Sequence, residues 1–397
     1  MTPLERLKFL ASIEGQEILQ HLATLKGDLP EIINTLRRRW NFDQTSAAIE
    51  QAALRARGRT RFCCSDEMLF TPQGLEQASG ERIARWRAGR FPQGATVLDL
   101  CCGCGGDLMQ MAGRGPVFGV DIDPATAFSA RHNLSLVGAE RASVACADAT
   151  ALRLNTDAVF FDPSRRLEGK RVHNADHYAP SLAFAEEILI SVPNLAVKVS
   201  PALEEEILES TRARVEFVSD HGECKEAILW YGDIGPHALR SATVLDQNGD
   251  WTLLQDSNSP TPELREPGGW LFEPNAAVVR SHLIAEVAAV CSAGQIDPQI
   301  AYLTADQESY SPFATTYRVI EWMPFNLKRL NARLRVLGRS VEAIKRRGVP
   351  LDPNELSRKL IGAGDRPTIV TLTRMNDRPI AILCERVKKN GNGDQPV

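Results

Sequence analysis

The sequence has no long apolar segment and no early run suited to export. Within its 397 residues, no apolar stretch approaches the roughly 18 residues that a membrane-spanning helix needs. Glu5, Arg6 and Lys8 bring charge into the N-terminal region too early for a secretory signal. We therefore expect a cytoplasmic protein without a membrane partner.

The sequence also lacks an excess of positive charge and a disulfide pattern. Its net charge is −4, so only a local basic patch could bind nucleic acid. The nine cysteines are odd in number and scattered, which favours thiols in a reducing compartment. Cys101 and Cys104 form a Cys-x-x-Cys pair, but no second ligand pair has zinc-site spacing, so no metal is predicted.

The N-terminal half divides into a helical region and an α/β region. Residues 1–65 carry apolar side chains at helical spacing, with breaks expected at Pro30 and Asn41. Residues 66–235 alternate short apolar strands with amphipathic stretches, which predicts a mostly parallel seven-stranded sheet. The predicted strands are 96–100, 116–120, 142–146, 157–161, 195–199, 214–218 and 226–231.

The C-terminal half begins with a connector at 236–270 that is rich in Pro, Gly, Asp and Ser. Residues 271–388 predict a second α/β unit, and residues 389–397 a disordered tail. The expected elements are a connector hairpin at 242–246 and 251–255, helices near 275–291, 325–337 and 353–361, strands near 299–303, 317–322 and 340–345, and a hairpin at 368–385.

A glycine-containing loop follows the first predicted strand. Val97-Leu98-Asp99-Leu100 leads into Cys101-Cys102-Gly103-Cys104-Gly105, and glycines let such a loop turn sharply and approach a ligand closely. In a doubly wound sheet, this loop lies at the carboxyl edge, where ligands bind. A dinucleotide-binding loop would prefer a third glycine where the sequence has Leu108. The carboxylate of Asp99 suits a cationic ligand instead.

Two further acids follow the next strands in order. Asp121 ends the second strand and could accept hydrogen bonds from both hydroxyls of a ribose. Asp123 is expected to cap the following helix, with Pro124 at its first position. Asp148 follows the third strand and could accept a hydrogen bond from an adenine amino group.

With these residues the sequence resembles the class I S-adenosylmethionine-dependent methyltransferases over about residues 66–235. Asp99, Gly103 and Gly105 match the first motif of that family, Asp121 the second and Asp148 the third. The resemblance implies a Rossmann-like domain in which these three acids face the methionine ammonium, the ribose and the adenine of S-adenosylmethionine. The expected cofactor-binding residues are Thr71, Asp99, Cys101, Gly103, Gly105, Asp121, Ile122, Asp148 and Ala149.

Thr71 belongs to the segment Phe70-Thr71-Pro72-Gln73-Gly74. Locally, Thr71 can cap a helix that starts at Pro72. A similar Thr-Pro entry precedes the cofactor strand in RNA methyltransferases such as trimethylguanosine synthases, where it lies near the methionine part of the cofactor.

The methyl-transfer residues are expected in Asp162-Pro163-Ser164-Arg165-Arg166. Methyltransferases that act on base amino nitrogens carry Asn/Asp-Pro-Pro-aromatic here, and positioning supplies most of the catalysis. Asp162 and Pro163 match and are predicted to be catalytic, whereas Ser164 and Arg165 depart from the pattern. Arg165 and Arg166 are predicted to bind the substrate by stacking or by gripping a phosphate; the alternative is that they anchor acidic neighbours.

Other polar groups have two interpretations each. The arginines at 37–39, 55, 57, 59 and 61 fit either solvated helix ends or a surface that faces RNA. His177 is a conceivable base, although a lone histidine is more often structural. Cys101 and Cys102 are conceivable nucleophiles for carbon methylation, but their place in the loop favours packing.

Basic residues concentrate in 325–348, where only Glu342 is acidic. They fit a phosphate-binding surface or a solvated helix face. With 270–274 and 311–313, this region resembles a THUMP-like domain, and the whole chain is similar to a bacterial family that joins a class I methyltransferase to such a domain. THUMP domains bind the ends of tRNA and related RNAs, so the resemblance implies an RNA partner held by Lys345, Arg346 and Arg347.

These observations favour an RNA methyltransferase that uses S-adenosylmethionine and modifies a tRNA or rRNA base. A methyltransferase of a protein or small molecule is the second hypothesis. The third is an RNA-binding protein that keeps the cofactor fold without turnover, which the departure at Ser164 and Arg165 leaves open.

Overall fold

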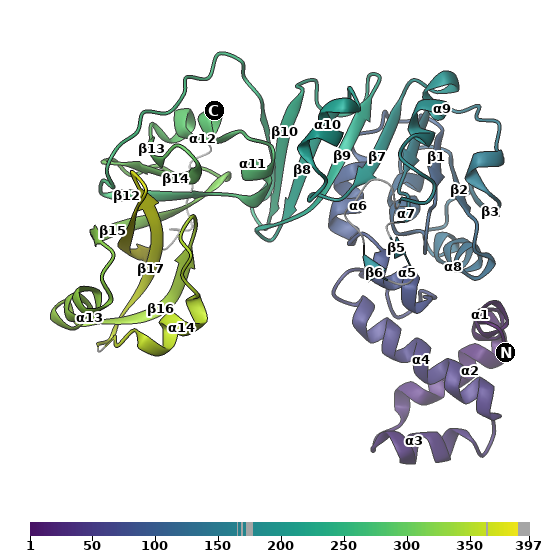
Figure 1. The fold of residues 1–397 in the computed structure, drawn as a ribbon. Coiled ribbons are helices and arrows are strands. Elements are labelled where there is room, and N and C mark those ends of the chain that lie inside the picture. Colours follow the sequence, from purple (N-terminus) through teal and green to yellow (C-terminus); the bar gives the residue numbers. More distant parts are fainter. Residues whose placement is uncertain (165, 168–169, 172–177, 363, 388–397) are drawn as a thin grey trace. The chain divides into compact units, whose positions relative to one another are not determined.

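The computed structural model describes residues 1–164, 166–167, 170–171, 178–362 and 364–387. The chain forms two compact units (Figure 1). The first contains Met1–Glu216 and Glu226–His237, and the second contains Phe217–Lys225 and Ala238–Val397. Every helix in the described part of the chain is too short or too polar to cross a membrane.

The first unit begins with four helices, each started by a side chain that caps its N-terminus. We expected the first break at Pro30, but the Ser12 hydroxyl accepts a hydrogen bond from Gly15 N at 3.2 Å and separates two helices already there. Pro30 lies in the first turn of the third helix, and Asn41 caps the fourth as expected. The helices are α1 (Pro3–Ala11), α2 (Ile13–Thr24), α3 (Leu29–Leu36) and α4 (Phe42–Gly58).

The parallel sheet of the first unit contains six of the seven predicted strands. Its order is β9-β7-β4-β1-β2-β3, parallel except for β9, which pairs antiparallel with β7. This arrangement confirms the Rossmann-like α/β fold. The remaining predicted strand is β8, which precedes β9 in the chain. The strands are β1 (Val97–Leu100), β2 (Val117–Asp121), β3 (Ala142–Cys146), β4 (Ala158–Phe161), β7 (Leu195–Val199), β8 (Arg214–Asp220) and β9 (Glu223–Tyr231).

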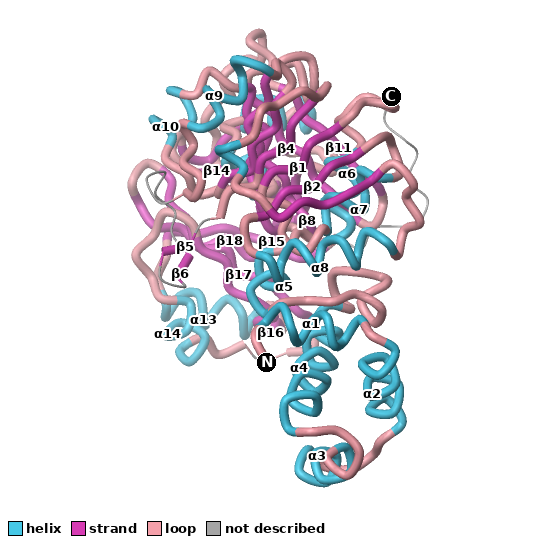
Figure 2. The backbone as a smooth tube through the Cα atoms, turned by 90° about the vertical axis from the view of Figure 1, so that its right-hand side faces the viewer, coloured by secondary structure: helices cyan, strands magenta, loops and turns pink. Residues whose placement is uncertain are grey.

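Helices connect these strands and position the loops at their carboxyl ends. Asp123 caps α8 by accepting a hydrogen bond from Thr126 N at 2.7 Å, as the sequence predicted. Helices α1 and α8 lie side by side (Figure 2), and Leu7 and Leu10 share a buried cluster with Ala125. The connecting elements are α5 (Pro72–Gln77), α6 (Glu81–Ala88), α7 (Gly106–Ala112), α8 (Pro124–Ser135), η1 (Ala149–Ala151), β5 (Arg166–Leu167), β6 (Lys170–Arg171), α9 (Phe184–Ser191) and α10 (Glu205–Ser210).

The second unit is built on a seven-stranded sheet in the order β13-β14-β12-β15-β18-β17-β16. Ile382 and Leu383 of β18 belong to two different buried clusters, as alternation along a strand requires. The strands of this sheet are β12 (Trp270–Pro274), β13 (Gly294–Asp297), β14 (Ile300–Ala305), β15 (Ala314–Pro324), β16 (Arg339–Arg346), β17 (Arg366–Met375) and β18 (Arg378–Arg386). The expected connector hairpin is formed by β10 (Arg240–Asp246) and β11 (Gly249–Leu254), which lie outside this seven-stranded sheet.

The helices of this unit depart from expectation at one place. The helix expected at 275–291 is two helices, because His282 takes a positive φ of 61° that an α-helix does not tolerate. Strands β12 and β13 were not predicted. The helices are α11 (Ala276–Arg280), α12 (Ile284–Cys291), α13 (Leu327–Val336) and α14 (Pro353–Lys359).

Candidate active site

A cavity of about 900 Å³ lies in the first unit, at the carboxyl edge of its parallel sheet. Its walls come from the loop after β1, the ends of β2 and β4, and the segment that begins at Thr71. Residues of α1 and α4, among them Arg6, Leu7 and Glu50, also line it. No sequence pattern predicts that the N-terminal helices reach this cavity, because their contribution depends on tertiary packing.

The loop after β1 turns through three residues with positive φ. They are Cys101 at 63°, Gly103 at 57° and Gly105 at 83°. A Cβ atom at Gly105 would also approach Ala130 Cα to 3.3 Å, so only glycine fits both the turn and the contact with α8. Cys101 and Gly103 line the cavity, whereas Gly105 lies behind it.

Asp121 ends β2 and lines the cavity. Its two carboxylate oxygens accept hydrogen bonds from Gly103 N and Asp123 N, each at 3.0 Å. Burial raises the pKa of Asp121, and these two backbone bonds partly oppose that rise. Each oxygen can accept a second hydrogen bond, so the carboxylate is held in place with capacity for a ligand hydroxyl.

Three of the other residues expected to bind the cofactor, Asp148, Ile122 and Ala149, line the cavity. Asp148 is exposed and accepts two hydrogen bonds from Thr150, from its hydroxyl at 2.7 Å and its amide at 2.9 Å, which lower the pKa of Asp148. Ile122, which is 69% exposed, and Ala149 line the same cavity. An exposed apolar side chain beside acceptor oxygens suits the flat face and polar edge of a purine.

Thr71 lines the same cavity and caps α5, accepting a hydrogen bond from Gly74 N at 2.9 Å. The cap places Pro72 at the start of the helix, as the local sequence predicted. Phe70 and Leu75 share a buried cluster with Cys104 of the cofactor loop. The Thr-Pro entry and this loop are therefore packed together.

Asp99 lies at the centre of β1 and is completely buried. Among the described residues, neither of its carboxylate oxygens has a hydrogen-bond partner. Burial, followed by the nearby charge of Asp162, raises the pKa of Asp99 well above its usual range, and Arg87 and Lys198 oppose the rise. Asp99 does not line the cavity surface, so it would act on a ligand through its charge.

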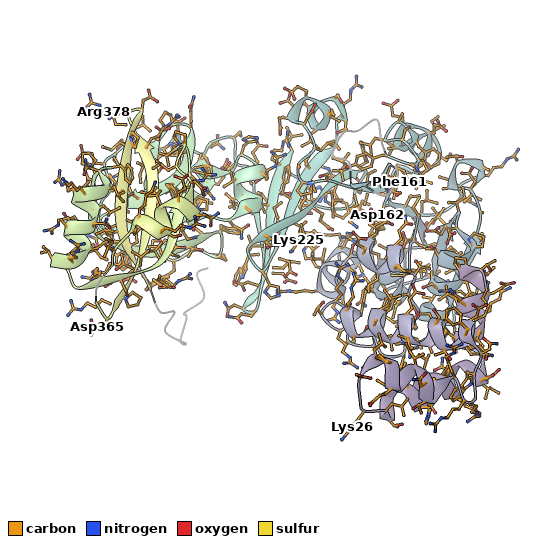
Figure 3. The ribbon with its side chains drawn as sticks, turned by 60° about the horizontal axis from the view of Figure 1, so that its bottom comes forward. Lys26, Phe161, Asp162, Lys225, Asp365 and Arg378 are labelled. Atoms are coloured by element: carbon orange, nitrogen blue, oxygen red, sulfur yellow. The ribbon has the colours of Figure 1, made fainter. Side chains whose placement is uncertain are left out.

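Asp162 follows Phe161 at the end of β4 (Figure 3) and lines the cavity with Pro163 and Ser164. Its Oδ2 atom lies 2.6 Å from Lys198 Nζ, which also contacts Ser79 Oγ at 3.1 Å. Lys198 was not among the functional residues predicted from the sequence. The signal that could have identified it is a single lysine inside the apolar strand Leu195–Val199, all of which is buried.

Arg87 forms a second charged cluster behind this wall. Its side chain is completely buried, pairs with Asp107 and Glu226, and contacts Glu226 Oε2 at 2.6 Å. The guanidinium also lies over the ring of Phe160 at 4.8 Å from the centroid. The two acids compensate the charge of Arg87, which links α6 to α7 and β9.

The thiols in the loop lack the properties of nucleophiles. Burial raises the pKa of Cys101, and nearby acids, Asp121 foremost, raise it further. Burial also raises the pKa of Cys102 well above its usual value. A protonated thiol is a poor nucleophile, which favours the packing role expected for both.

Part of the expected substrate loop falls outside the described residues, including Arg165 and His177. Arg166 lies in β5, and nothing is described of its side chain. At the ends of the loop, Ser164 and Ala179 exchange two backbone hydrogen bonds of 3.0 Å. Tyr178 is buried and accepts a hydrogen bond from Ser200 N at 2.8 Å.

Three arginines in and after α4 have partners within the chain. Arg55 Nε donates to Met68 O at 2.9 Å, and Arg61 Nη1 donates to Leu75 O at 2.5 Å. Arg59 pairs with Asp66 at 3.0 Å. These contacts favour a structural role over the RNA-facing interpretation at these three positions.

The three basic residues expected to hold RNA in the second unit differ in exposure. Lys345 pairs with Glu273 and lies over Tyr317. Arg347 lies over Tyr302 and donates to Ala301 O at 3.2 Å. Arg346 is exposed and donates to Leu351 O at 2.7 Å. All three side chains therefore have contacts within their own unit, and Arg346 is the one that is exposed.

Comparison with known families matches three parts of the chain. A "Methyltransferase domain" matches residues 97–163, a "THUMP domain-like" family matches residues 314–386, and a domain of unknown function matches residues 3–58. An uncharacterized S-adenosylmethionine-dependent methyltransferase of Mycobacterium tuberculosis, found in strains CDC 1551 and H37Rv, is 32% identical over 345 residues, covering 84% of this chain and 94% of the relative. The chain belongs to the S-adenosylmethionine-dependent methyltransferases.

The solved structures show the same fold beyond the methyltransferase core. The crystal structure of a presumed methyltransferase from Porphyromonas gingivalis W83 matches with a TM-score of 0.77 at 20% identity, covering 94% of this chain and 98% of that chain. The likeness thus extends over residues of both units. At this identity, the likeness concerns the fold alone.

S-adenosylmethionine fits the residues around the cavity. The cofactor carries an ammonium and a sulfonium, and the unpartnered carboxylate of Asp99 lies behind a wall that also holds Asp121 and Asp162. The volume of about 900 Å³ is at the upper end of the roughly 300–1,000 Å³ typical of ligand sites. It leaves room for the cofactor and a reacting group together.

The raised pKa of Asp99 predicts that cofactor binding releases protons. A buried carboxyl whose pKa is raised keeps its proton to a higher pH than a free carboxyl, and a cation bound nearby favours the ionised form. Affinity for the cofactor should therefore increase as pH rises through the pKa of Asp99 in the free enzyme. Calorimetry in buffers of different ionisation enthalpy should show release of up to one proton by the wild type and less by Asp99→Asn. An equal release by both proteins would exclude Asp99 as its source.

Proposed function

We propose that this methyltransferase modifies a base of RNA, with tRNA or rRNA as substrate. The observation that carries the proposal is the position of Asp162 and Pro163 in the wall of the cavity that the cofactor loops line. One cavity thus holds residues suited to the cofactor and residues suited to a base. A base that enters beside Asp162 would lie in the same cavity as the methyl group of the cofactor.

Bound S-adenosylmethionine supplies an electrophilic methyl group. A lone pair on the base would form the new bond to the methyl carbon, and the electrons of the S–C bond would pass to sulfur, which would give S-adenosylhomocysteine. The base then loses a proton to water or to Asp162. Because this is an in-line displacement, the residues of this chain contribute by orienting the base and excluding water.

The charge of the THUMP-like segment supports RNA as the substrate. Residues 314–386 contain 15 Lys and Arg against seven Asp and Glu, within a chain of net charge −4. On α13, Lys328, Arg329 and Arg335 are exposed, whereas Arg333 pairs with Glu321 at 2.7 Å. Exposed cations such as these three are accessible to phosphates.

Charge reversal on α13 should weaken RNA binding without unfolding the unit. We expect the triple variant Lys328→Glu, Arg329→Glu, Arg335→Glu to lower affinity for tRNA or rRNA at least tenfold at low salt, and to reduce the slope of affinity against salt. Filter binding across a salt series measures both quantities.

A matched control separates this effect from loss of fold. Lys345→Glu places two acids against each other at Glu273 and should lower the melting temperature of the unit, whereas the α13 variant should not. RNA affinity and salt slope that stay at wild-type values in the folded α13 variant would remove this helix from the RNA surface.

A further inference from the structure

The pairing register brings Lys198 beside Asp162. Strands β4 and β7 are parallel neighbours in which Phe161 pairs with Val197, so the next residue on each is Asp162 and Lys198. Lys198 is 5% exposed yet lines the cavity. A lysine is rarely buried to this degree unless its ammonium is paired.

The contacts of Lys198 fix one face of the Asp162 carboxylate. Lys198 Nζ binds Asp162 Oδ2 at 2.6 Å and Ser79 Oγ at 3.1 Å. Ser79 lies in the turn between α5 and α6, so the ammonium is held from a third element. With Oδ2 engaged, Oδ1 is the oxygen left to accept a hydrogen bond from a base in the cavity.

The ion pair between Lys198 and Asp162 can hold the Asp162 carboxylate in place where the segment after it lacks residues that would make the loop rigid. Ser164 and Arg165 stand where a second proline and an aromatic residue would restrict the loop. An ion pair from the neighbouring strand can orient Asp162 without them, because both strands belong to a buried sheet. Orientation of this kind is what an in-line displacement requires.

We propose that Lys198 is the positioning residue for Asp162, and that the pair selects a base nitrogen that carries hydrogen. The inference rests on the proposed function, since it takes an RNA base as the substrate. An ion-paired carboxylate accepts hydrogen bonds but is a weak base. It can therefore orient an N–H group, whereas a ribose hydroxyl would need a stronger base and a ring carbon would offer no polar hydrogen.

Several other charged groups lie around this pair and must be held constant in a test. Asp99 lies on β1, Asp121 ends β2, and Arg87 on α6 contacts Asp107 and Glu226. A purely structural role for Lys198 would be to balance these acids. Substitutions at Lys198 itself leave all five groups in place.

The test uses the full-length enzyme, tritiated S-adenosylmethionine and RNA extracted from cells that lack the protein. We expect Lys198→Met to lower kcat about 100-fold with the KM for the cofactor changed less than about threefold. Lys198→Arg, which keeps the cation, should recover at least a tenth of the wild-type kcat. Lys225→Met, which removes an exposed pair with Glu223, is the matched control.

The outcomes separate this inference from the proposed function. Wild-type product methylated on nitrogen supports both, whereas a methyl group on carbon or on a ribose oxygen overturns the inference alone. RNA without label overturns the proposed function and the inference with it. Unchanged kcat in Lys198→Met, or equal losses of kcat in Lys198→Met and Lys198→Arg, overturns the positioning role. If Lys198→Met does not bind the cofactor, Lys198→Arg decides: at least a tenth of the wild-type kcat supports the role, and a lower kcat overturns it.

Discussion

Replacing Asp162 by alanine should reduce methyl transfer about 1,000-fold while S-adenosylmethionine still binds. The carboxylate is the acidic group that meets the cavity at the end of β4, and its Oδ1 is the acceptor we assign to the base. Its loss removes both the hydrogen bond to the base and the ion pair with Lys198. Single-turnover assays with labelled cofactor measure the chemical step, and calorimetry measures cofactor binding.

Asp162→Asn provides the matched control for this prediction. It keeps an acceptor oxygen at nearly the same place but loses the negative charge, so we expect an intermediate reduction of about 10- to 100-fold. A fully active Asp162→Ala enzyme would contradict the assignment. Equal losses in both variants would show that the charge, and not the acceptor position, is what the reaction uses.

Replacing Arg87 by methionine should lower the free energy of unfolding of the first unit by about 3–5 kcal/mol. The change leaves the buried acids Asp107 and Glu226 facing each other without the cation that now binds both. It also removes the stacking on Phe160. Urea denaturation followed by circular dichroism measures the loss.

The control for Arg87 lies one half-turn away on the same helix. Arg85 pairs with Glu81, and its side chain is 68% exposed. Because exposed pairs contribute little, Arg85→Met should change the unfolding free energy by less than about 1 kcal/mol. Similar effects of the two substitutions would contradict the importance of the buried cluster.

Local patterns were sufficient to predict the strands of the parallel sheet in the first unit and the acids at their ends. The apolar runs that became β1, β2 and β4 are short and bounded by polar residues, and the carboxyl ends of parallel strands must share one edge. Asp121, which ends β2, and Asp148, which follows β3, therefore line one cavity. Thr71, which precedes a helix, lines the same cavity. The capping roles of Asp123 and Thr71 followed from the same local chemistry.

Contacts between distant residues explain what the sequence did not reveal. Lys198 reaches Asp162 only because β7 pairs with β4. The local sequence predicts that Lys345 is available to RNA, whereas in the structure it pairs with Glu273, 72 residues away. The helices α1 and α4 meet the cavity through packing on α8 and the loop after β1, which no periodicity encodes.

The most direct test of the RNA assignment is mass spectrometry of nucleosides from tRNA and rRNA of cells with and without this methyltransferase. We predict the loss of one methylated nucleoside, with its methyl group on nitrogen, and its return when the wild-type enzyme but not Asp162→Ala is supplied. Identical nucleoside profiles in the two kinds of cell would contradict the assignment of RNA as the substrate.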